Sequence, residues 1–312
     1  MKHRITEART RKSVPAGGRA GWARRLAAVT GVVVLCALPT GPAGAAQANP
    51  PSPDRPPLFV SDYGNNRVVR LPGAGEGPAT VPLDGVVRPT GLAWDAARDL
   101  FVSDTGNNRV VKLEARGGAQ TTVPTVGLSR PLGLAVDTRG TLYIADSFND
   151  RVVKVPSDGT GQTTVPTTGL LHPWGLALDA RGDLYVSDFV NDRVVRIAAD
   201  GGGQTTVPTS GLSQPTGLAV NAGGDLYISD SGNNRVVKVS ARDGGQSTVP
   251  TTGLNDPLGL ALDGRGGLYV ADGFNDRVVR VTEAGGGQVT LPAPGLNTPT
   301  GLAFPPAEKQ HG

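Results

Sequence analysis

The sequence predicts an all-β fold, a six-bladed β-propeller with four short strands in each blade. The main observation is a segment that occurs six times, first as Ser-Asp-Tyr-Gly-Asn-Asn-Arg-Val-Val-Arg at residues 61–70. Variants of it recur every 42 residues without insertion or deletion, and a Pro-x-Gly-Leu-Ala segment recurs at the same interval from Pro89 to Pro299. Short apolar runs separated by turn signals fill each interval, and no helical periodicity is present. A fixed period of about 40 residues with four strands is typical of propeller blades.

One complete repeat, residues 131–172, illustrates the expected blade. Strands are expected at 133–137, 142–146, 151–155 and 162–166, because aliphatic, aromatic and β-branched residues there are separated by turns rich in Gly, Asn and Asp. The first of these strands carries small residues on alternate positions, which suits the crowded axis of a ring. The middle two strands are apolar on both faces, which indicates sheets packed between neighbouring sheets.

The number of strands at the two ends of the repeat array predicts how the ring closes. Five complete units begin at Pro89 and at each following repeat. Residues 58–83 supply three further strands, and residues 299–304 supply a single strand that matches the first strand of a unit. Together they complete a sixth blade, so the C-terminal strand is expected to pair with the N-terminal three. This closure removes the exposed edges that an open array would leave.

The first 48 residues are expected to be a signal peptide. Residues 1–25 carry eight Lys or Arg and one acidic residue, and the apolar run Leu26–Leu38 follows them. Small residues then lead to Ala48, the expected cleavage position, with Ala45 and Ala46 as alternatives. The apolar run of 13 residues is too short to span a bilayer as a helix.

The mature protein is therefore expected to be secreted or associated with the cell envelope, with no membrane span. The pair Arg24 and Arg25 leaves twin-arginine export open as an alternative to the general secretory route. After cleavage the chain would consist of a Pro-rich spacer at 49–57, the propeller at 58–304 and a polar tail at 305–312.

Loss of the leader reverses the sign of the net charge. The whole chain has 30 Lys and Arg against 27 Asp and Glu, a net charge of +3. Residues 1–48 contain 8 of these bases and 1 of these acids, which leaves 22 against 26 and a net charge of −4. Nucleic acid is therefore not an expected partner. The single cysteine, Cys36, lies in the leader, so no disulfide is expected, and we expect a monomer.

The acidic and basic residues of the repeated segment are interpreted as structural pins. Asp and Arg would lie close across the mouth of a hairpin, and an Arg guanidinium matches a carboxylate in shape. The Asn between them, such as Asn149, could close the turn by bonding its own backbone. A ring of calcium-binding carboxylates is the alternative, but the adjacent arginines argue against it. The predicted pins are Asp62, Asp104, Asp146, Asp188, Asp230, Asp272, Arg67, Arg109, Arg151, Arg193, Arg235 and Arg277.

These units resemble the NHL repeat, a family of six-bladed propellers. The resemblance rests on Pro131-Leu-Gly-Leu-Ala-Val-Asp, Leu142-Tyr-Ile-Ala-Asp, Asn149-Asp-Arg-Val-Val-Lys-Val and Thr164-Val-Pro-Thr-Thr-Gly-Leu, and it covers residues 58–304. The repeats look like the extracellular sensor domain of actinobacterial receptor Ser/Thr kinases, although this chain carries no kinase domain. The NHL family also includes an amidating lyase, and other propeller families include streptogramin lyases and lactonases. Membership of such a fold does not decide the function.

No catalytic residues, metal ligands or cofactor are predicted. After the leader is removed, only His172 and His311 remain, so a site with two or three histidines is not available within the propeller. No Gly-x-Ser-x-Gly elbow is present. The Gly runs at 201–203 and 285–287 precede strands and therefore do not form a phosphate-binding loop at a helix N-terminus.

Specificity is expected where the repeats differ from one another. The loop before each Pro-x-Gly and the loop after each repeated Asp should emerge on the same face, because the strands alternate in direction. One sector of that face is basic and aromatic, a composition that is enriched in binding hot spots. The alternative is that its aromatic residues only fill the loops and that its arginines are solvated. The candidate binding residues are Arg88, Arg130, Phe148, His172, Trp174 and Phe189.

The sequence therefore favours an exported binding or scaffold module that docks a protein, peptide or glycan through one face of the propeller. Two other functions remain open. One is a propeller enzyme of the lyase or lactonase type, and the other is a ligand sensor that acts with a separate kinase.

Overall fold

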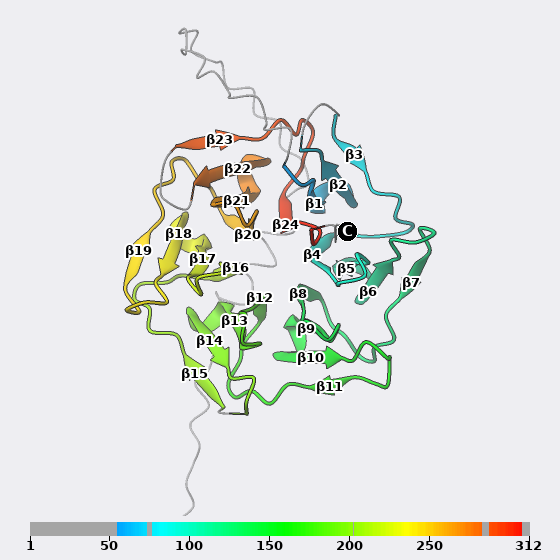
Figure 1. Ribbon diagram of the computed structural model, residues 1–312, viewed down its shortest axis with the longest axis horizontal. Coiled ribbons are helices and arrows are strands. Elements are labelled where there is room, and N and C mark those ends of the chain that lie inside the picture. Colours follow the sequence, from blue (N-terminus) through cyan, green and yellow to red (C-terminus); the bar gives the residue numbers. More distant parts are fainter. Residues whose placement is uncertain (1–54, 74–76, 202, 283–286, 308–312) are drawn as a thin grey trace, which may run out of the picture. The chain divides into compact units, whose positions relative to one another are not determined.

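Six four-stranded antiparallel sheets stand as blades around a central axis in the described part of the chain (Figure 1). The computed structural model describes residues 55–73, 77–201, 203–282 and 287–307, all within the compact unit Ala48–Gly312. The predicted six-bladed propeller is confirmed. The expected signal peptide at 1–48 lies outside the described residues, as does most of the spacer. Among the described residues no helix has the length and apolar character needed to cross a bilayer.

The innermost strand of each blade starts at the repeated proline, which is two residues earlier than the predicted strand 133–137 and agrees with the predicted start at Pro299. Proline is tolerated at the first position of a strand, where its missing N–H is not required. Pro131 lies opposite Asp146, and regular pairing resumes at Leu134 after a register irregularity. The inner strands are β4 (Pro89–Trp94), β8 (Pro131–Val136), β12 (Pro173–Leu178), β16 (Pro215–Val220), β20 (Pro257–Leu262) and β24 (Pro299–Ala303).

The glycine of each Pro-x-Gly segment allows the inner strands to crowd around the axis. A Cβ atom added to Gly217 would lie 2.1 Å from the carbonyl oxygen of Leu258 in the next blade. Such a contact is far inside van der Waals distance, so the two inner strands could not keep this spacing. The small residue at this position therefore sets the width of the ring.

The second and third strands of each blade form the apolar layer of the propeller. The predicted strands at 142–146 and 151–155 are observed with these bounds. Side chains from adjacent blades interlock, as where Phe101 of one blade packs in one cluster with Ile144 and Val153 of the next. The second strands are β1 (Leu58–Asp62), β5 (Leu100–Asp104), β9 (Leu142–Asp146), β13 (Leu184–Asp188), β17 (Leu226–Asp230) and β21 (Gly267–Asp272). The third are β2 (Arg67–Leu71), β6 (Arg109–Leu113), β10 (Arg151–Val155), β14 (Arg193–Ile197), β18 (Arg235–Val239) and β22 (Arg277–Thr282).

A single turn of 3₁₀ helix connects the second strand to the third in every blade. Each turn ends at an Asn or Asp in the left-handed region, such as Asn66 with φ 53°. Asn and Asp tolerate that region better than other residues with a Cβ atom. The turns are η1 (Tyr63–Asn65), η2 (Thr105–Asn107), η3 (Ser147–Asn149), η4 (Phe189–Asn191), η5 (Ser231–Asn233) and η6 (Gly273–Asn275).

The outermost strands are short and exposed along the rim. The strand predicted at 162–166 contains only two paired residues, because it has a neighbour on one side only and Pro166 cannot donate to a ladder. Short edge strands next to proline resist pairing with other chains. These strands are β3 (Ala79–Thr80), β7 (Gln120–Thr122), β11 (Thr163–Thr164), β15 (Gln204–Thr206), β19 (Gln246–Thr248) and β23 (Gln288–Thr290).

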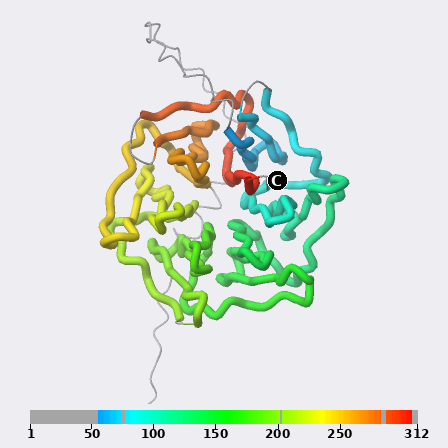
Figure 2. Tube along the Cα trace, in the orientation of Figure 1, coloured from blue at the N-terminus to red at the C-terminus, as the bar shows by residue number. Residues whose placement is uncertain are grey.

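The C-terminal strand completes the first blade. β24 pairs antiparallel with β1, with Leu302 opposite Val60, and the sheet order is β24-β1-β2-β3. Figure 2 shows the red segment that contains β24 inside the blue N-terminal strands. We number this sheet blade 1, and blades 2 to 6 follow in chain order from β4–β7 to β20–β23.

A glutamine on the rim ties each of blades 2 to 6 to the loop that enters it. The Gln162 side chain accepts a hydrogen bond from the Val126 N–H at 3.1 Å and donates one to the Val126 carbonyl at 3.2 Å. Gln120, Gln204, Gln246 and Gln288 make the same pair of bonds in their blades. In blade 1 the equivalent positions are Pro78 and Pro294, which line a cavity of about 200 Å³. Neither proline has an N–H or an amide side chain, so the two glutamine hydrogen bonds cannot form at the boundary between blades 6 and 1.

Candidate functional site

Each blade carries a buried carboxylate clamp where its second strand ends. In blade 4 the Asp188 side chain has no exposed surface, and Arg193 Nε lies 2.7 Å from Asp188 Oδ2. The Asn191 amide donates to both Asp188 carboxylate oxygens, at 2.8 and 2.9 Å, and to the Gly169 carbonyl at 2.8 Å. The Leu171 N–H donates to Asp188 Oδ1 at 2.7 Å. The carboxylate therefore holds the loop that enters the blade, in addition to pairing with the arginine.

The other five blades repeat this clamp, with Arg Nε to Asp Oδ2 distances of 2.6 to 2.7 Å. The predicted role of the asparagine is corrected: Asn149 does not bond its own backbone but bridges Asp146 Oδ2 and the Gly127 carbonyl. The pairs are Asp62–Arg67, Asp104–Arg109, Asp146–Arg151, Asp230–Arg235 and Asp272–Arg277. All six predicted pairs thus form, and their contribution to stability stays a prediction.

We expect Arg193→Ala to lower the melting temperature and to leave ligand binding unchanged. The substitution leaves the buried Asp188 carboxylate without its cation, which costs about 1–3 kcal/mol, or roughly 2–12 °C for a chain of this size. Arg181→Ala, at an exposed position in the same blade, is the control and should melt like the wild type. Calorimetry gives both values, and an unchanged melting temperature for Arg193→Ala would remove the structural interpretation.

A second set of hydrogen bonds, which we call latches, joins neighbouring blades on the face that carries the 3₁₀ turns. We call this face the Asp-loop face. The residue before each repeated proline has a left-handed backbone, with φ 51° at Arg88 and 47° at Arg130. Its N–H donates to the side chain that ends the 3₁₀ turn of the preceding blade. The donor–acceptor pairs are Arg88–Asn66, Arg130–Asn108, His172–Asp150, Gln214–Asp192, Asp256–Asn234 and Thr298–Asp276.

Two positions that vary between repeats contact each other within a blade, and their side chains are complementary. The residue after the proline contacts the first residue of the 3₁₀ turn, which lies 15 residues later in blades 2 to 6. Thr90 and Thr105 share a hydrogen bond of 2.7 Å, and Thr216 and Ser231 share one of 2.6 Å. Gly273 faces Leu258, whose side chain would lie 2.8 Å from an added Cβ atom. Sequence analysis missed this correspondence, although the paired substitutions are a signal that could have revealed it.

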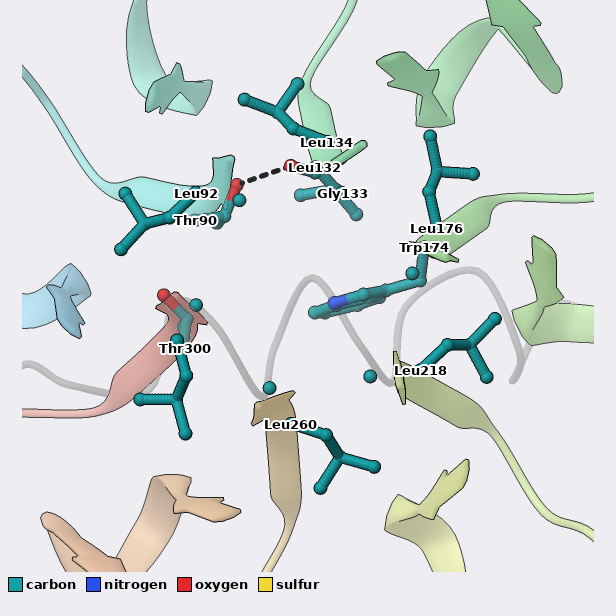
Figure 3. Close-up of a pocket in the computed structure, with 16 residues that line it drawn as sticks. Thr90, Leu92, Leu132, Gly133, Leu134, Trp174, Leu176, Leu218, Leu260 and Thr300 are labelled. Atoms are coloured by element: carbon teal, nitrogen blue, oxygen red, sulfur yellow. Dashed lines mark hydrogen bonds between the residues drawn. The ribbon is translucent and has the colours of Figure 1, made fainter. Parts of the chain in front are cut away.

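Trp174 belongs to the central channel and not to the outer surface. Its side chain is 9% exposed, and its ring lies 5.2 Å from that of Phe189, which is 5% exposed. The indole projects from β12 into the channel between the inner strands (Figure 3). The remaining channel cavity is about 70 Å³. The expectation that Trp174 and Phe189 are exposed is therefore wrong, because they are the matched pair of blade 4 and pack against each other.

The other four candidate residues lie together on the Asp-loop face. Arg88 is exposed, and the Arg130 guanidinium carbon lies 4.8 Å above the ring of Phe148. Phe148 is 38% exposed and packs edge-on against His172, at 5.1 Å between ring centroids. The His172 Nδ1 atom lies 3.2 Å from the Ser147 carbonyl oxygen. We call Arg88, Arg130, Phe148 and His172 the basic sector.

Tyr63 extends the basic sector toward the channel and was not among the predicted site residues. Its ring is 5% exposed, and the Arg88 guanidinium carbon lies 6.0 Å from the ring centroid. Burial raises the pKa of the Tyr63 phenol, and the positive charges of Arg88 and Arg130 oppose that rise. Both arginines therefore act on the same hydroxyl group.

A metal site or an activated histidine would indicate covalent chemistry on this face. Within the described ranges no cluster of three His, Cys, Asp or Glu residues could hold a metal ion. His172 is the one histidine among the described residues, and its Nδ1 atom lies 3.2 Å from the Ser147 carbonyl oxygen and 3.9 Å from Asp150 Oδ1.

Comparison with known families matches the repeat to two family models. Residues 212–239 match the NHL repeat, and residues 64–216 match the SMP-30/gluconolactonase/LRE-like region. The resemblance to NHL-repeat propellers is confirmed. No curated protein matches the sequence significantly.

Solved structures share the propeller fold at low identity. A chain of the nidogen/laminin complex aligns with a TM-score of 0.71 and 23% identity, over 79% of this chain and 97% of that one. Streptogramin B lyase aligns with a TM-score of 0.56 and 20% identity, over 66% and 70%. Virginiamycin B lyase from Staphylococcus aureus aligns with a TM-score of 0.61 and 16% identity, over 82% and 91%. These likenesses show the fold alone, and they include both a protein complex and enzymes.

Proposed function

We propose that this protein is an exported binding module that docks a protein or peptide partner through the basic sector of its Asp-loop face. The observation that carries the proposal is the contrast between that sector and the rest of the face. Clamps and latches repeat in every blade, whereas Arg130 stacked on Phe148 beside His172 occurs once. Arginine and aromatic residues at a surface are typical of binding hot spots.

Two further observations support a binding role. The first is that all six clamp carboxylates are engaged by arginine and asparagine, so they serve the scaffold and leave the sector as the variable part. The second is the alignment with a chain from a protein complex, that of nidogen and laminin. Export is part of the proposal and rests on the charged and apolar pattern of residues 1–48.

Affinity capture with matched variants tests the proposal. The protein is immobilised and exposed to envelope and medium extracts of its source, beside the double variant Arg88→Met/Arg130→Met. The control is Arg139→Met/Arg181→Met, which removes the same charge from exposed positions in the turns at the opposite ends of the strands. We expect a partner, identified by mass spectrometry, that the wild type and the control retain and the first variant loses. Equal retention by all three proteins would contradict docking at the basic sector.

An enzyme of the lyase or lactonase type is the second candidate. The match of residues 64–216 to the SMP-30/gluconolactonase/LRE-like region and the alignments with two lyases favour it. Lactone hydrolysis and streptogramin B cleavage are the reactions to assay, with His172→Ala as the matched variant. Turnover that disappears in this variant would favour the enzyme over the binding module.

A further inference from the structure

The six latches of the Asp-loop face are not equivalent in charge. Four of the six latches contain a carboxylate. In three of them it is the acceptor at the end of the 3₁₀ turn, and these acceptors are Asp150, Asp192 and Asp276. In the fourth, the donor residue before the proline is Asp256. In the latches of Arg88 and Arg130 the acceptors are the neutral amides of Asn66 and Asn108. The face is therefore positive at Arg88 and Arg130, on the loops that enter blades 2 and 3, and acidic from Asp150, at the end of the 3₁₀ turn of blade 3, around to blade 6.

The positive part gathers around Tyr63. The Arg88 guanidinium carbon lies 6.0 Å from the centroid of the Tyr63 ring. The positive charge of Arg130, on the loop that enters the next blade, acts on the same phenol, and its guanidinium carbon lies 4.8 Å from the centroid of the Phe148 ring. The Tyr63 hydroxyl can donate its own hydrogen. Two guanidinium groups and one hydroxyl thus present hydrogen-bond donors from blades 1, 2 and 3.

We propose that Tyr63, Arg88 and Arg130 form a recognition site for a single carboxylate of a peptide partner, that of an acidic side chain. This inference rests on the proposed binding function and names the chemical group that the partner presents. Arginine forks match carboxylates in shape and bind them with paired, charge-assisted hydrogen bonds.

Two features favour one carboxylate over a polyanion. Residues 49–312 carry a net charge of −4, and the acidic part of the face would repel a long chain of negative charges. Two neighbours of the site are exposed apolar side chains, Val87 at 36% and Phe148 at 38%. A short segment with one acidic group between apolar residues therefore complements the site in both charge and polarity.

Titration with three model peptides tests the proposal directly. The probes are N-acetylated, C-amidated tripeptides with phenylalanine at both ends and glutamate, glutamine or phosphoserine in the centre. Side-chain NMR signals of arginine Nε–H and of labelled tyrosine report binding. We expect the glutamate peptide to shift Arg88, Arg130 and Tyr63 saturably and the glutamine peptide to leave them unchanged. Equal shifts with glutamine, no saturable shift with glutamate, or tighter binding of phosphoserine would overturn the proposal.

Variants then assign the effect to these residues. Arg88→Met should weaken glutamate-peptide binding about 10- to 100-fold, because it removes charge-assisted hydrogen bonds. Tyr63→Phe keeps the buried ring and removes the donor, so it should weaken binding severalfold without lowering the melting temperature. Arg139→Met on the opposite side is the charge-matched control and should bind normally. Loss of binding in this control would show that general charge, and not the site, attracts the peptide.

Failure of this inference can be separated from failure of the proposed function. If capture from extracts depends on Arg88 and Arg130 while the glutamate peptide does not bind, docking stands and carboxylate recognition is wrong. If the peptide binds and capture yields no partner that depends on these arginines, the site stands and the proposed docking function fails. The pKa of Tyr63 provides an independent check of the cluster, because Arg88→Met removes an opposing charge and should raise that pKa further.

Discussion

A protein that ends after Thr298 is expected not to fold into a closed propeller. The deletion removes β24, which is the innermost strand of blade 1 and the pairing partner of β1. Leu302 belongs to the same buried cluster as Val60 and Tyr269, so its loss opens the core between blades 6 and 1. The inner glycine contacts that set the ring width would also be missing at Gly301. We expect no cooperative thermal transition by calorimetry and a larger hydrodynamic radius by size-exclusion chromatography.

The matched control for this deletion ends after Phe304. It keeps all of β24 and the contact between Phe304 and Tyr269, whose ring centroids are 4.9 Å apart. Its melting temperature should lie within a few degrees of that of the full chain. A synthetic peptide of residues 299–304 should restore a cooperative transition to the shorter protein. A deletion variant that melts like the full chain would show that β24 does not close the ring.

Trp174→Ala is expected to cost about 3–5 kcal/mol of unfolding free energy, a decrease of roughly 6–20 °C in melting temperature. The indole is 9% exposed, fills the channel and packs against Phe189, so its truncation leaves a cavity and exposes a second aromatic ring. The effect should appear without any ligand present, because it arises from packing.

Phe274→Ala is the control for this prediction. Phe274 lies on the same face but is 38% exposed, so its truncation should change the melting temperature little. Equal melting temperatures for Trp174→Ala and the wild type would mean that the indole contributes no packing energy. The same result would restore Trp174 as a candidate surface residue for binding.

Much of the fold could be predicted because the sequence pattern of each strand and turn recurs six times. The middle strands of blade 3 were placed correctly at 142–146 and 151–155, since their apolar runs end at sharp turn signals. The predicted bounds of the strands at the two edges of each blade were less accurate, and the errors had opposite directions. The inner strand gains Pro131, whose missing N–H is not required there, whereas the outer strand loses residues near Pro166, which cannot donate to a neighbour.

The candidate site could be predicted only in part, because exposure depends on contacts between segments. Phe148 and Phe189 both follow a repeated aspartate, but one position separates them within the 3₁₀ turn. Phe189 is the first residue of its turn and faces Trp174, while Phe148 is the second residue of its turn and faces solvent. Tyr63 is also a first residue, and its meeting with Arg88 follows only from the order of blades in the closed ring.

The prolines at 78 and 294 make one boundary of the ring different from the other five. The other five pairs of neighbouring blades are tied by a glutamine pair as well as by the connecting chain, whereas at this boundary prolines replace the glutamine pair. Blade 1 is itself closed by the pairing of β24 with β1, between residues about 240 positions apart. We therefore expect this cycle of six nearly identical units to open first between β24 and β1. When it does so, β1 and β24 become free edges that fit the same strands of another molecule, so exchange of β24 between chains is the natural route to association during refolding.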